Sequence, residues 1–504
     1  MTHYNFDKEG DFECENVDIV IVGGGIVGSF IGHRLSQMSN KKVIILEAGS
    51  EKPSADYDWL QVEPNESKYR GAVHGRTIGL GGTSSKWGGA LIPVSESELL
   101  SDLWPPEYLD LIKYSRHIED FFNLNHKPYE NRNQSELFPA YSKRVVKFPS
   151  FRNRNVFQLI RKELIRNNDF KYVLNARVTQ FNFCRDLVSS VVISSPSGHS
   201  RLIRAEKFIV TTGALESTRM LLDIYAKNQT VFEGKKLPQI RSLVDHVSIP
   251  IGELIEFDFK DMSLLFGLKF NSKGMHKIKY ESNLPCLNYS LDIKFAAVDK
   301  SPRELVRKIM QALQKRKPID VKVLLNLAVN TGFILKSLLW RYLFKTFLES
   351  RNSKLIVNLT ISQSTHSDNF VRLGSARDED GIARLKIDWS VTSADTSQIF
   401  SAMKEFQSNW ANSGLSKKCS FVLYDRNRVL QTISNTGGTL HPSGLIKIGT
   451  NSELDDLDLN LKVHGTRNFY CLSSGVLPTI TTVNPVMTTL LLGCKLSENL
   501  LDKK

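Results

Sequence analysis

The sequence predicts an α/β protein in which a Rossmann-like dinucleotide-binding domain is discontinuous and a second, α+β domain is inserted into it. Residues 17–49 read as strand, glycine-rich turn, helix and strand, which is the βαβ unit of a parallel sheet. The chain has 504 residues, more than the roughly 250 to 300 at which one hydrophobic core stops growing. Because no low-complexity linker interrupts the chain, we expect the second domain to be inserted and not appended.

The βαβ unit begins with the nearly continuous apolar run at 17–22, as expected of a strand buried on both faces of a parallel sheet. Apolar side chains then recur at helical spacing from Ile26 to Met38, and residues 42–46 form the next strand. Gly23, Gly25 and Gly28 satisfy the G-x-G-x-x-G pattern between strand and helix. This turn lets a pyrophosphate approach the backbone and the helix N-terminus.

Glu47 ends the second strand 24 residues after Gly23. A carboxylate there can accept hydrogen bonds from both hydroxyls of an adenosine ribose and repels a 2′-phosphate. The alternative is a tight turn followed by a surface glutamate. This unit alone does not decide between NAD and FAD.

A second glycine cluster, GLGGTSSKWGG at 79–89, indicates another stretch of backbone that lies against a flat ligand, because side chains would block such an approach. The alternative is a glycine-rich surface loop. The strand predicted at 207–210 ends in Thr211-Thr212-Gly213-Ala214, and strand ends of this kind also line dinucleotide sites.

The other elements follow from apolar periodicity and turn residues. The expected elements are strands over 178–192 and 201–210, a helix from Glu216, strands over 247–299 with alternation through 251–270, helices over 301–349, and a hairpin over 371–389. Near the C-terminus, Asn484 followed by Pro485 is typical of a helix start, with a capping side chain and then a residue that needs no N–H partner. A cap is the plainest interpretation of Asn484.

Taken together, these segments resemble the glucose-methanol-choline (GMC) oxidoreductase family, flavoenzymes that oxidise alcohols. The resemblance rests on GGGIVG with LEAG, GLGGTSSKWGG, TTGALESTRMLL, Asp245-His246, HPSGLIKIG and GVLPTITTVNPVMT, which occur in the family's order over nearly the whole chain. It implies an FAD-dependent oxidoreductase that acts on the CH–OH group of a small-molecule alcohol, polyol or sugar. The enzyme would be either an oxidase or a dehydrogenase. The electron acceptor is not identified.

In this resemblance His441 falls at the active-site histidine and Asn484 at its partner position, as in members that pair histidine with asparagine. Neutral imidazole, with an ordinary pKa of about 6.5, can accept the hydroxyl proton of an alcohol. The helix that begins at Pro485 would place its positive end under the flavin. His246 and His464 are interpreted as structural.

The resemblance also implies the cofactor contacts and the domain limits. The expected FAD contacts are Gly23, Gly25, Gly28, Glu47, Gly82, Thr83, Ser84, Trp87, Gly475 and Pro485. Lys86 stands where members with covalent flavin have histidine, so FAD is expected to be noncovalent. The family pattern departs at Lys447, Ile448 and Ser473. We expect the FAD domain over 1–247 and 431–504, with the substrate domain over 248–430.

Two other functions are compatible with these motifs: a different FAD or NAD oxidoreductase on the same dinucleotide fold, and a non-catalytic, membrane-associated flavin-binding protein. No metal site is expected, because the six cysteines are scattered without a CxxC pair. No nucleic-acid partner is expected, because no binding motif accompanies the net charge of +13.

The charge is concentrated in one helical segment. Residues 301–350 contain ten Lys or Arg and three acids, more than half of the net charge in a tenth of the chain. Either a basic amphipathic helix lies on an anionic membrane surface, or an ordinary helix presents a solvated basic face. The acidic N-terminus does not resemble a secretory signal, and no segment is expected to span a membrane. We expect a cytoplasmic protein, peripheral at the inner membrane surface under the first interpretation.

Overall fold

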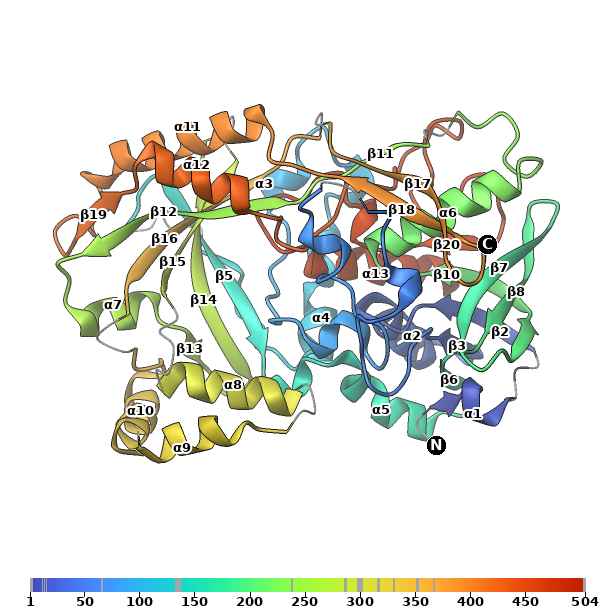
Figure 1. The fold of residues 1–504 in the computed structure, drawn as a ribbon, viewed down its shortest axis with the longest axis horizontal. Coiled ribbons are helices and arrows are strands. Elements are labelled where there is room, and N and C mark those ends of the chain that lie inside the picture. The colour runs from blue at the N-terminus through green and yellow to red at the C-terminus, as the bar shows by residue number, and fades with distance from the viewer. Residues whose placement is uncertain are drawn as a thin grey trace.

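The computed structural model describes residues 3–501 except 11, 13, 15, 65–66, 132–136, 237–238, 285–287, 297–301, 315–317, 330, 350–352 and 366–367. Lys315, Arg316 and Lys317 of the basic segment therefore lie outside the described residues. The described chain forms two sheet-based halves, seen side by side in Figure 1.

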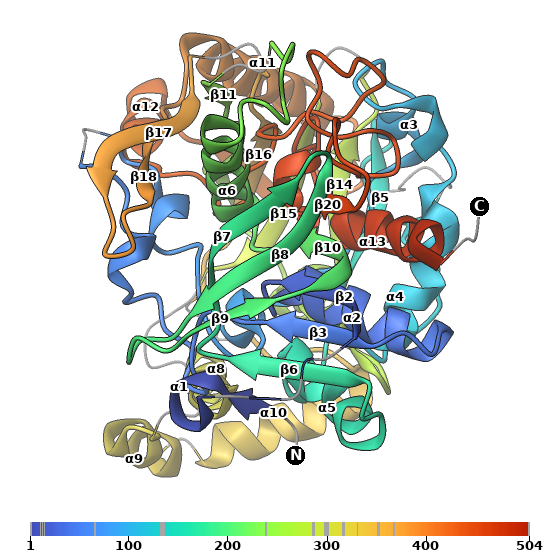
Figure 2. The same ribbon diagram turned by 90° about the vertical axis from the view of Figure 1, so that its right-hand side faces the viewer.

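The predicted α/β fold with a parallel, Rossmann-like sheet is confirmed. The sheet has the order β1-β6-β3-β2-β10-β20, and all its pairs are parallel. Its strands are β1 (Tyr4–Asn5), β6 (Phe170–Leu174), β3 (Val43–Leu46), β2 (Val17–Val22), β10 (Ala205–Val210) and β20 (Phe469–Cys471). The C-terminal β20 pairs with β10, so the end of the chain returns to the sheet that the N-terminal segment began (Figure 2).

Four longer helices belong to the half built on this sheet, and all except α5 are predicted by the sequence. They are α2 (Ile26–Met38), α5 (Val156–Arg166), α6 (Ala214–Lys227) and α13 (Pro485–Leu501). Pro485 is the first residue of α13, as predicted, and α13 lies against α2. Helix α6 begins two residues before the predicted Glu216, directly after Gly213, whose φ is +83°. Short helices α1 (Phe6–Glu9), α3 (Glu96–Leu99) and α4 (Ser115–Phe121) lie in the N-terminal third.

The predicted meander is a separate three-stranded antiparallel sheet of β7 (Arg177–Cys184), β8 (Leu187–Ser194) and β9 (Ser200–Ile203). The predicted hairpin is formed by β17 (Phe370–Arg377) and β18 (Ala383–Asp388), with β11 (Arg241–Ser242) at its edge. The buried apolar residues of this hairpin belong to the core around the parallel sheet.

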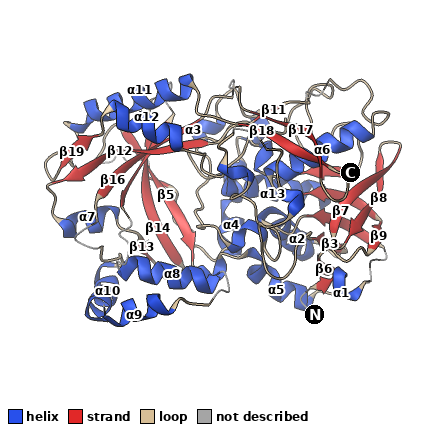
Figure 3. Ribbon diagram, in the orientation of Figure 1, coloured by secondary structure: helices blue, strands red, loops and turns tan. Residues whose placement is uncertain are grey.

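The second half is built on an antiparallel sheet with the order β19-β12-β16-β15-β14-β5-β4, and β13 pairs with β14. The strands are β4 (Glu130–Asn131), β5 (Tyr141–Pro149), β12 (His246–Ile255), β13 (Lys269–Phe270), β14 (Gly274–Ser282), β15 (Tyr289–Phe295), β16 (Leu355–Ser362) and β19 (Ser420–Leu423). Helices α11 (Ser393–Trp410) and α12 (Arg426–Asn435) cover one face and share a second hydrophobic core with it (Figure 3).

One predicted strand is wrong. The alternation through 251–270 breaks at α7 (Phe259–Phe266). The Asp258 side chain accepts a hydrogen bond from the backbone N–H of Asp261 and caps the helix. Met262, Leu265 and Phe266 then reach the second core together, which is helical spacing. A short apolar run can fit both periods, and here the cap and the core select the helix.

The predicted helical segment forms α8 (Pro302–Gln314), α9 (Val321–Val329) and α10 (Thr331–Phe344), a layer at one end of the antiparallel sheet (Figure 1). Among the described residues, no helix has both the length and the apolar character needed to cross a membrane.

Candidate active site

A cavity of about 510 Å³ lies at the carboxyl ends of the parallel strands β2, β3 and β10. Ligands of open α/β sheets bind at this edge. Residues far apart in the chain line it: the turn after β2, the second glycine cluster, the loop around His441, and the start of α13. The N-terminal turn of α13 contributes Pro485, Val486 and Thr489, so the positive end of that helix faces the cavity.

The lining leaves backbone open to a ligand at three glycines. A Cβ added at Gly25, Gly88 or Gly213 would meet no atom within 4 Å, and all three residues line the cavity. Such a cradle fits a flat, phosphate-bearing cofactor that lies against the main chain.

Glu47 joins the two glycine segments. Its Oε2 accepts the backbone N–H of Gly24 at 2.8 Å, and its Oε1 accepts those of Gly49 at 3.1 Å and Gly79 at 2.8 Å. Burial raises the pKa of Glu47, and the three N–H donors act in the opposite direction. The carboxylate lines the cavity and also holds the second glycine cluster against the first turn, a role that the sequence did not predict.

The expected cofactor contacts divide into two groups. The lining contains Gly23, Gly25, Glu47, Gly82, Thr83, Trp87 and Pro485, whereas Gly28, Ser84 and Gly475 are not among its residues. A Cβ at Gly28 would lie 2.0 Å from the Gly23 carbonyl oxygen, so Gly28 permits close packing of α2 on the turn. Ser84 is fully buried and accepts the backbone N–H of Val156 at 3.0 Å.

His441 and Asn484 come together although 43 residues separate them. The Asn484 Nδ2 lies 3.3 Å from the His441 Nε2, and His441 lines the cavity. His464 lies elsewhere, with its Nε2 3.0 Å from the Gly449 carbonyl oxygen.

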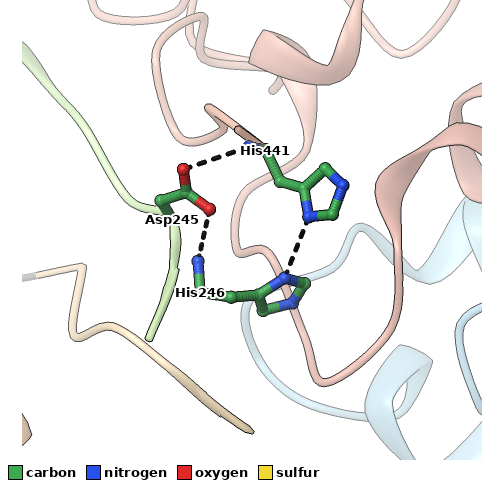
Figure 4. Close-up of side chains that lie close together, drawn as sticks. All are labelled: Asp245, His246 and His441. Carbon is green, nitrogen blue, oxygen red and sulfur yellow. Dashed lines mark hydrogen bonds between the residues drawn. The ribbon is translucent and has the colours of Figure 1, made fainter. Parts of the chain in front are cut away.

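Behind His441 lies a residue that the sequence did not place in the site (Figure 4). His246, the first residue of β12, has its Nδ1 3.2 Å from the His441 Nδ1, and the two rings are nearly perpendicular, at 88°. Its Nε2 lies 2.9 Å from the Thr481 carbonyl oxygen. The Asp245-His246 pair was visible in the sequence, but no local pattern connects it with His441.

Asp245 fixes this arrangement. Its Oδ1 accepts the His246 backbone N–H at 2.6 Å and the Thr439 hydroxyl at 2.8 Å. Its Oδ2 accepts the Tyr69 hydroxyl at 2.9 Å and the His441 backbone N–H at 3.0 Å. Gly438 is required nearby, because its φ is +79° and a Cβ there would lie 2.8 Å from the Asp245 Oδ2.

Asp245, His246 and His441 offer ligand atoms that all lie within 4.8 Å of one another, which is also a geometry for a metal ion. Four donors occupy the Asp245 carboxylate, however, and the two histidines face each other through Nδ1. We therefore describe the cluster as a hydrogen-bond network.

Both imidazoles are held neutral. Burial lowers the pKa of His441, and Asp245 acts in the opposite direction. Burial lowers the pKa of His246 further, and His441 and Lys279 add to that effect. Neither ring is therefore charged at neutral pH.

The hydrogen bonds fix where each proton lies. A carbonyl oxygen can only accept, so the His246 Nε2 donates to Thr481 and its Nδ1 is an acceptor. The His441 Nδ1 must then be protonated and donate to the His246 Nδ1, 3.2 Å away. The His441 Nε2 is consequently unprotonated, and its lone pair faces the Nδ2 donor of Asn484. This is the form of histidine that can accept a proton from a ligand.

Three comparisons place the chain among known proteins. Residues 365–493, which include both His441 and Asn484, match the family model for the C-terminal part of GMC oxidoreductases. This match covers about a quarter of the chain. The resemblance identified from the sequence is thereby confirmed.

The chain is also similar to the oxygen-dependent choline dehydrogenases of Staphylococcus aureus strains JH9 and Newman. It is 36% identical to each over 90 residues, which cover 14% of this chain and 16% of the relative. The match thus spans about a sixth of the length of these curated relatives. The fold is similar to that of pyridoxine 4-oxidase from Mesorbium loti, with a TM-score of 0.58 and 14% identity over 96% of this chain and 99% of that chain.

Proposed function

We propose that this protein is a GMC oxidoreductase, an FAD-dependent enzyme that oxidises the CH–OH group of a small-molecule alcohol, polyol or sugar, with His441 as the base. The observation that carries the proposal is the unprotonated His441 Nε2, which faces Asn484 beside a cavity with a glycine cradle. The names of the relatives, choline dehydrogenase and pyridoxine 4-oxidase, both refer to alcohols.

The cradle fits noncovalent FAD. Gly23, Gly25 and the N-terminus of α2 would hold the pyrophosphate, and Glu47 would accept the ribose hydroxyls. The N-terminal turn of α13 and the segment from Gly82 to Trp87 would line the flavin. Lys86 in that segment carries no imidazole for a covalent link. Bound FAD supplies a two-electron acceptor for the hydride on the substrate carbon.

The chain's own residues handle the proton. The His441 Nε2 accepts the substrate hydroxyl proton, in the place where it now meets the Asn484 amide. Asn484 Nδ2 then donates to the substrate oxygen and fixes its position. The His246 Nδ1 keeps the His441 Nδ1 protonated before the reaction, and the nearby Asp245 carboxylate favours the positive charge on His441 after it.

We also propose the division of labour between the two halves. The parts over 1–247 and 431–504 would bind FAD and carry the catalytic pair, and the part over 248–430 would contact the substrate. In support, Lys279 on β14 donates to the Thr482 carbonyl at 3.3 Å, two residues before Asn484, so the antiparallel sheet adjoins the catalytic loop.

Anaerobic reduction tests the proposal. The purified protein should be yellow, should release intact FAD on denaturation, and should lose its flavin absorbance with at least one member of a panel of alcohols, polyols and sugars. Admission of air would then separate an oxidase from a dehydrogenase. A protein that binds no FAD on reconstitution would contradict the proposed function, and flavin that no alcohol reduces would favour a non-catalytic flavin-binding protein.

A further inference from the structure

Helix α10 presents an apolar stripe to solvent. Leu335, Leu338, Leu339, Tyr342 and Leu343 follow the spacing i, i+3, i+4, i+7, i+8, so they share one face of the helix. Each is between 56% and 74% exposed. Soluble monomers rarely expose a contiguous apolar patch of this kind unless it contacts something. We call these five residues the α10 stripe.

Helix α10 is attached to the protein at its C-terminal end, and Trp340 and Phe344 lie on the side of the helix away from the stripe. The Trp340 ring lies 4.3 Å from that of Phe344, and the Trp340 Nε1 donates to the Thr346 hydroxyl at 2.9 Å. Just after the helix, the Lys345 carbonyl accepts the backbone N–H of Phe270 on β13 at 2.6 Å. Trp340 on this side of the helix is half-buried, and the α10 stripe lies on the other side, exposed to solvent.

The charges around the stripe have one sign. Residues 321–345 contain Lys322, Lys336, Arg341 and Lys345 and no acid, and all four basic residues are exposed. At 100° per residue, Lys336 and Arg341 lie on opposite sides of the stripe. Helix α9 adds exposed Val321 and Leu325 close by. Helices α9 and α10 lie at the lower edge of the molecule in both views (Figures 1 and 2).

We propose that the α10 stripe docks on the surface of an anionic lipid bilayer. The helix would lie parallel to the surface, with the five apolar side chains at the boundary between headgroups and acyl chains and the flanking cations at lipid phosphates. A helix of 14 residues is shorter than the roughly 20 residues that span a bilayer. A second copy of the chain fits less well, because it would bring two all-basic segments together with no acid to neutralise them.

Vesicle flotation of the FAD-loaded protein tests the proposal without an activity measurement. We expect flotation with vesicles of phosphatidylcholine and phosphatidylglycerol at low salt, little with phosphatidylcholine alone, and a decline as salt rises, because exposed charges are screened over ~8 Å at physiological ionic strength. The double variant Leu338→Glu/Leu339→Glu should weaken partitioning by at least about tenfold. Lys336→Gln/Lys345→Gln should weaken it with the anionic vesicles only.

The matched control is Ile165→Glu on α5, another exposed apolar side chain, 55% exposed, far from the stripe in sequence. It should float like the wild type. Absence of wild-type flotation at low salt, or equal flotation with both lipid compositions, would overturn the proposal. So would a dimer, seen by analytical ultracentrifugation, that Leu338→Glu/Leu339→Glu dissociates while vesicles bind nothing. Flavin reduction and flotation are separate readouts, so failure of the proposed oxidation leaves this test intact.

Discussion

His246→Phe is the substitution that isolates the position of the proton on His441. Phenylalanine keeps the planar shape of the ring but removes the Nδ1 acceptor 3.2 Å from the His441 Nδ1. The His441 proton then loses its imidazole partner and retains only the Thr439 hydroxyl oxygen, at 3.0 Å. The Nε2-protonated form of His441, which cannot accept a proton from an alcohol, gains population.

The expected magnitude follows from the lost bond. A neutral hydrogen bond contributes a net of about 0.5 to 1.5 kcal/mol, and each 1.36 kcal/mol is tenfold in rate. Flavin reduction by a saturating substrate should therefore slow by about 2- to 13-fold. His441→Ala, which removes the base itself, should slow it by about 10²- to 10⁴-fold.

Anaerobic stopped-flow reduction of the FAD-loaded variants is the assay. His464→Phe is the matched control, because it also removes an imidazole from a carbonyl partner, at 3.0 Å, outside the cavity lining. If His246 acts through His441, adding His246→Phe to His441→Ala should cause no further loss. A further loss as large as that of His246→Phe alone would refute the reasoning.

Three other predictions follow from the same geometry. Because burial lowers the pKa of His441, the imidazole stays neutral in mild acid. The rate of flavin reduction should therefore decline only below about pH 6.5. A pH profile in which this rate falls to half at a higher pH would contradict the expectation. Asn484→Asp loses the Nδ2 donor that lies 3.3 Å from the His441 Nε2 and adds negative charge. Substrate should therefore reduce the flavin of this variant at least about tenfold more slowly, while α13 stays folded. An unchanged rate of reduction would leave Asn484 with a capping role alone. Glu47→Gln replaces a carboxylate that accepts three backbone N–H groups with an amide whose NH₂ faces those donors. FAD should therefore dissociate at least about tenfold more readily, as measured by equilibrium dialysis. The exposed Glu51→Gln is the control, and equal FAD retention by both variants would count against the role of Glu47.

The sequence determined the elements whose signal is local. The apolar run of β2, the glycine turn, the spacing of α2 and the Pro485 start of α13 are all encoded within a few residues of where they act. Local signals fail where a short apolar run fits two periods. The segment predicted as alternating strand became α7, because the Asp258 cap and the second core decided the period.

Only the tertiary structure decided which of these residues meet and in what chemical state. Asp245 and His246 contact the loop of His441 across 195 residues of chain, and no periodicity encodes a contact at that separation. The same holds for Glu47, whose carboxylate meets Gly79 only when two loops converge. It also holds for α10, which is attached through the hydrogen bond of the Lys345 carbonyl to Phe270. The sequence by itself determined the residue types on which the proposed alcohol oxidation depends. Burial and hydrogen-bond direction, which exist only in the folded chain, decided that His441 is neutral and that its unprotonated nitrogen is Nε2.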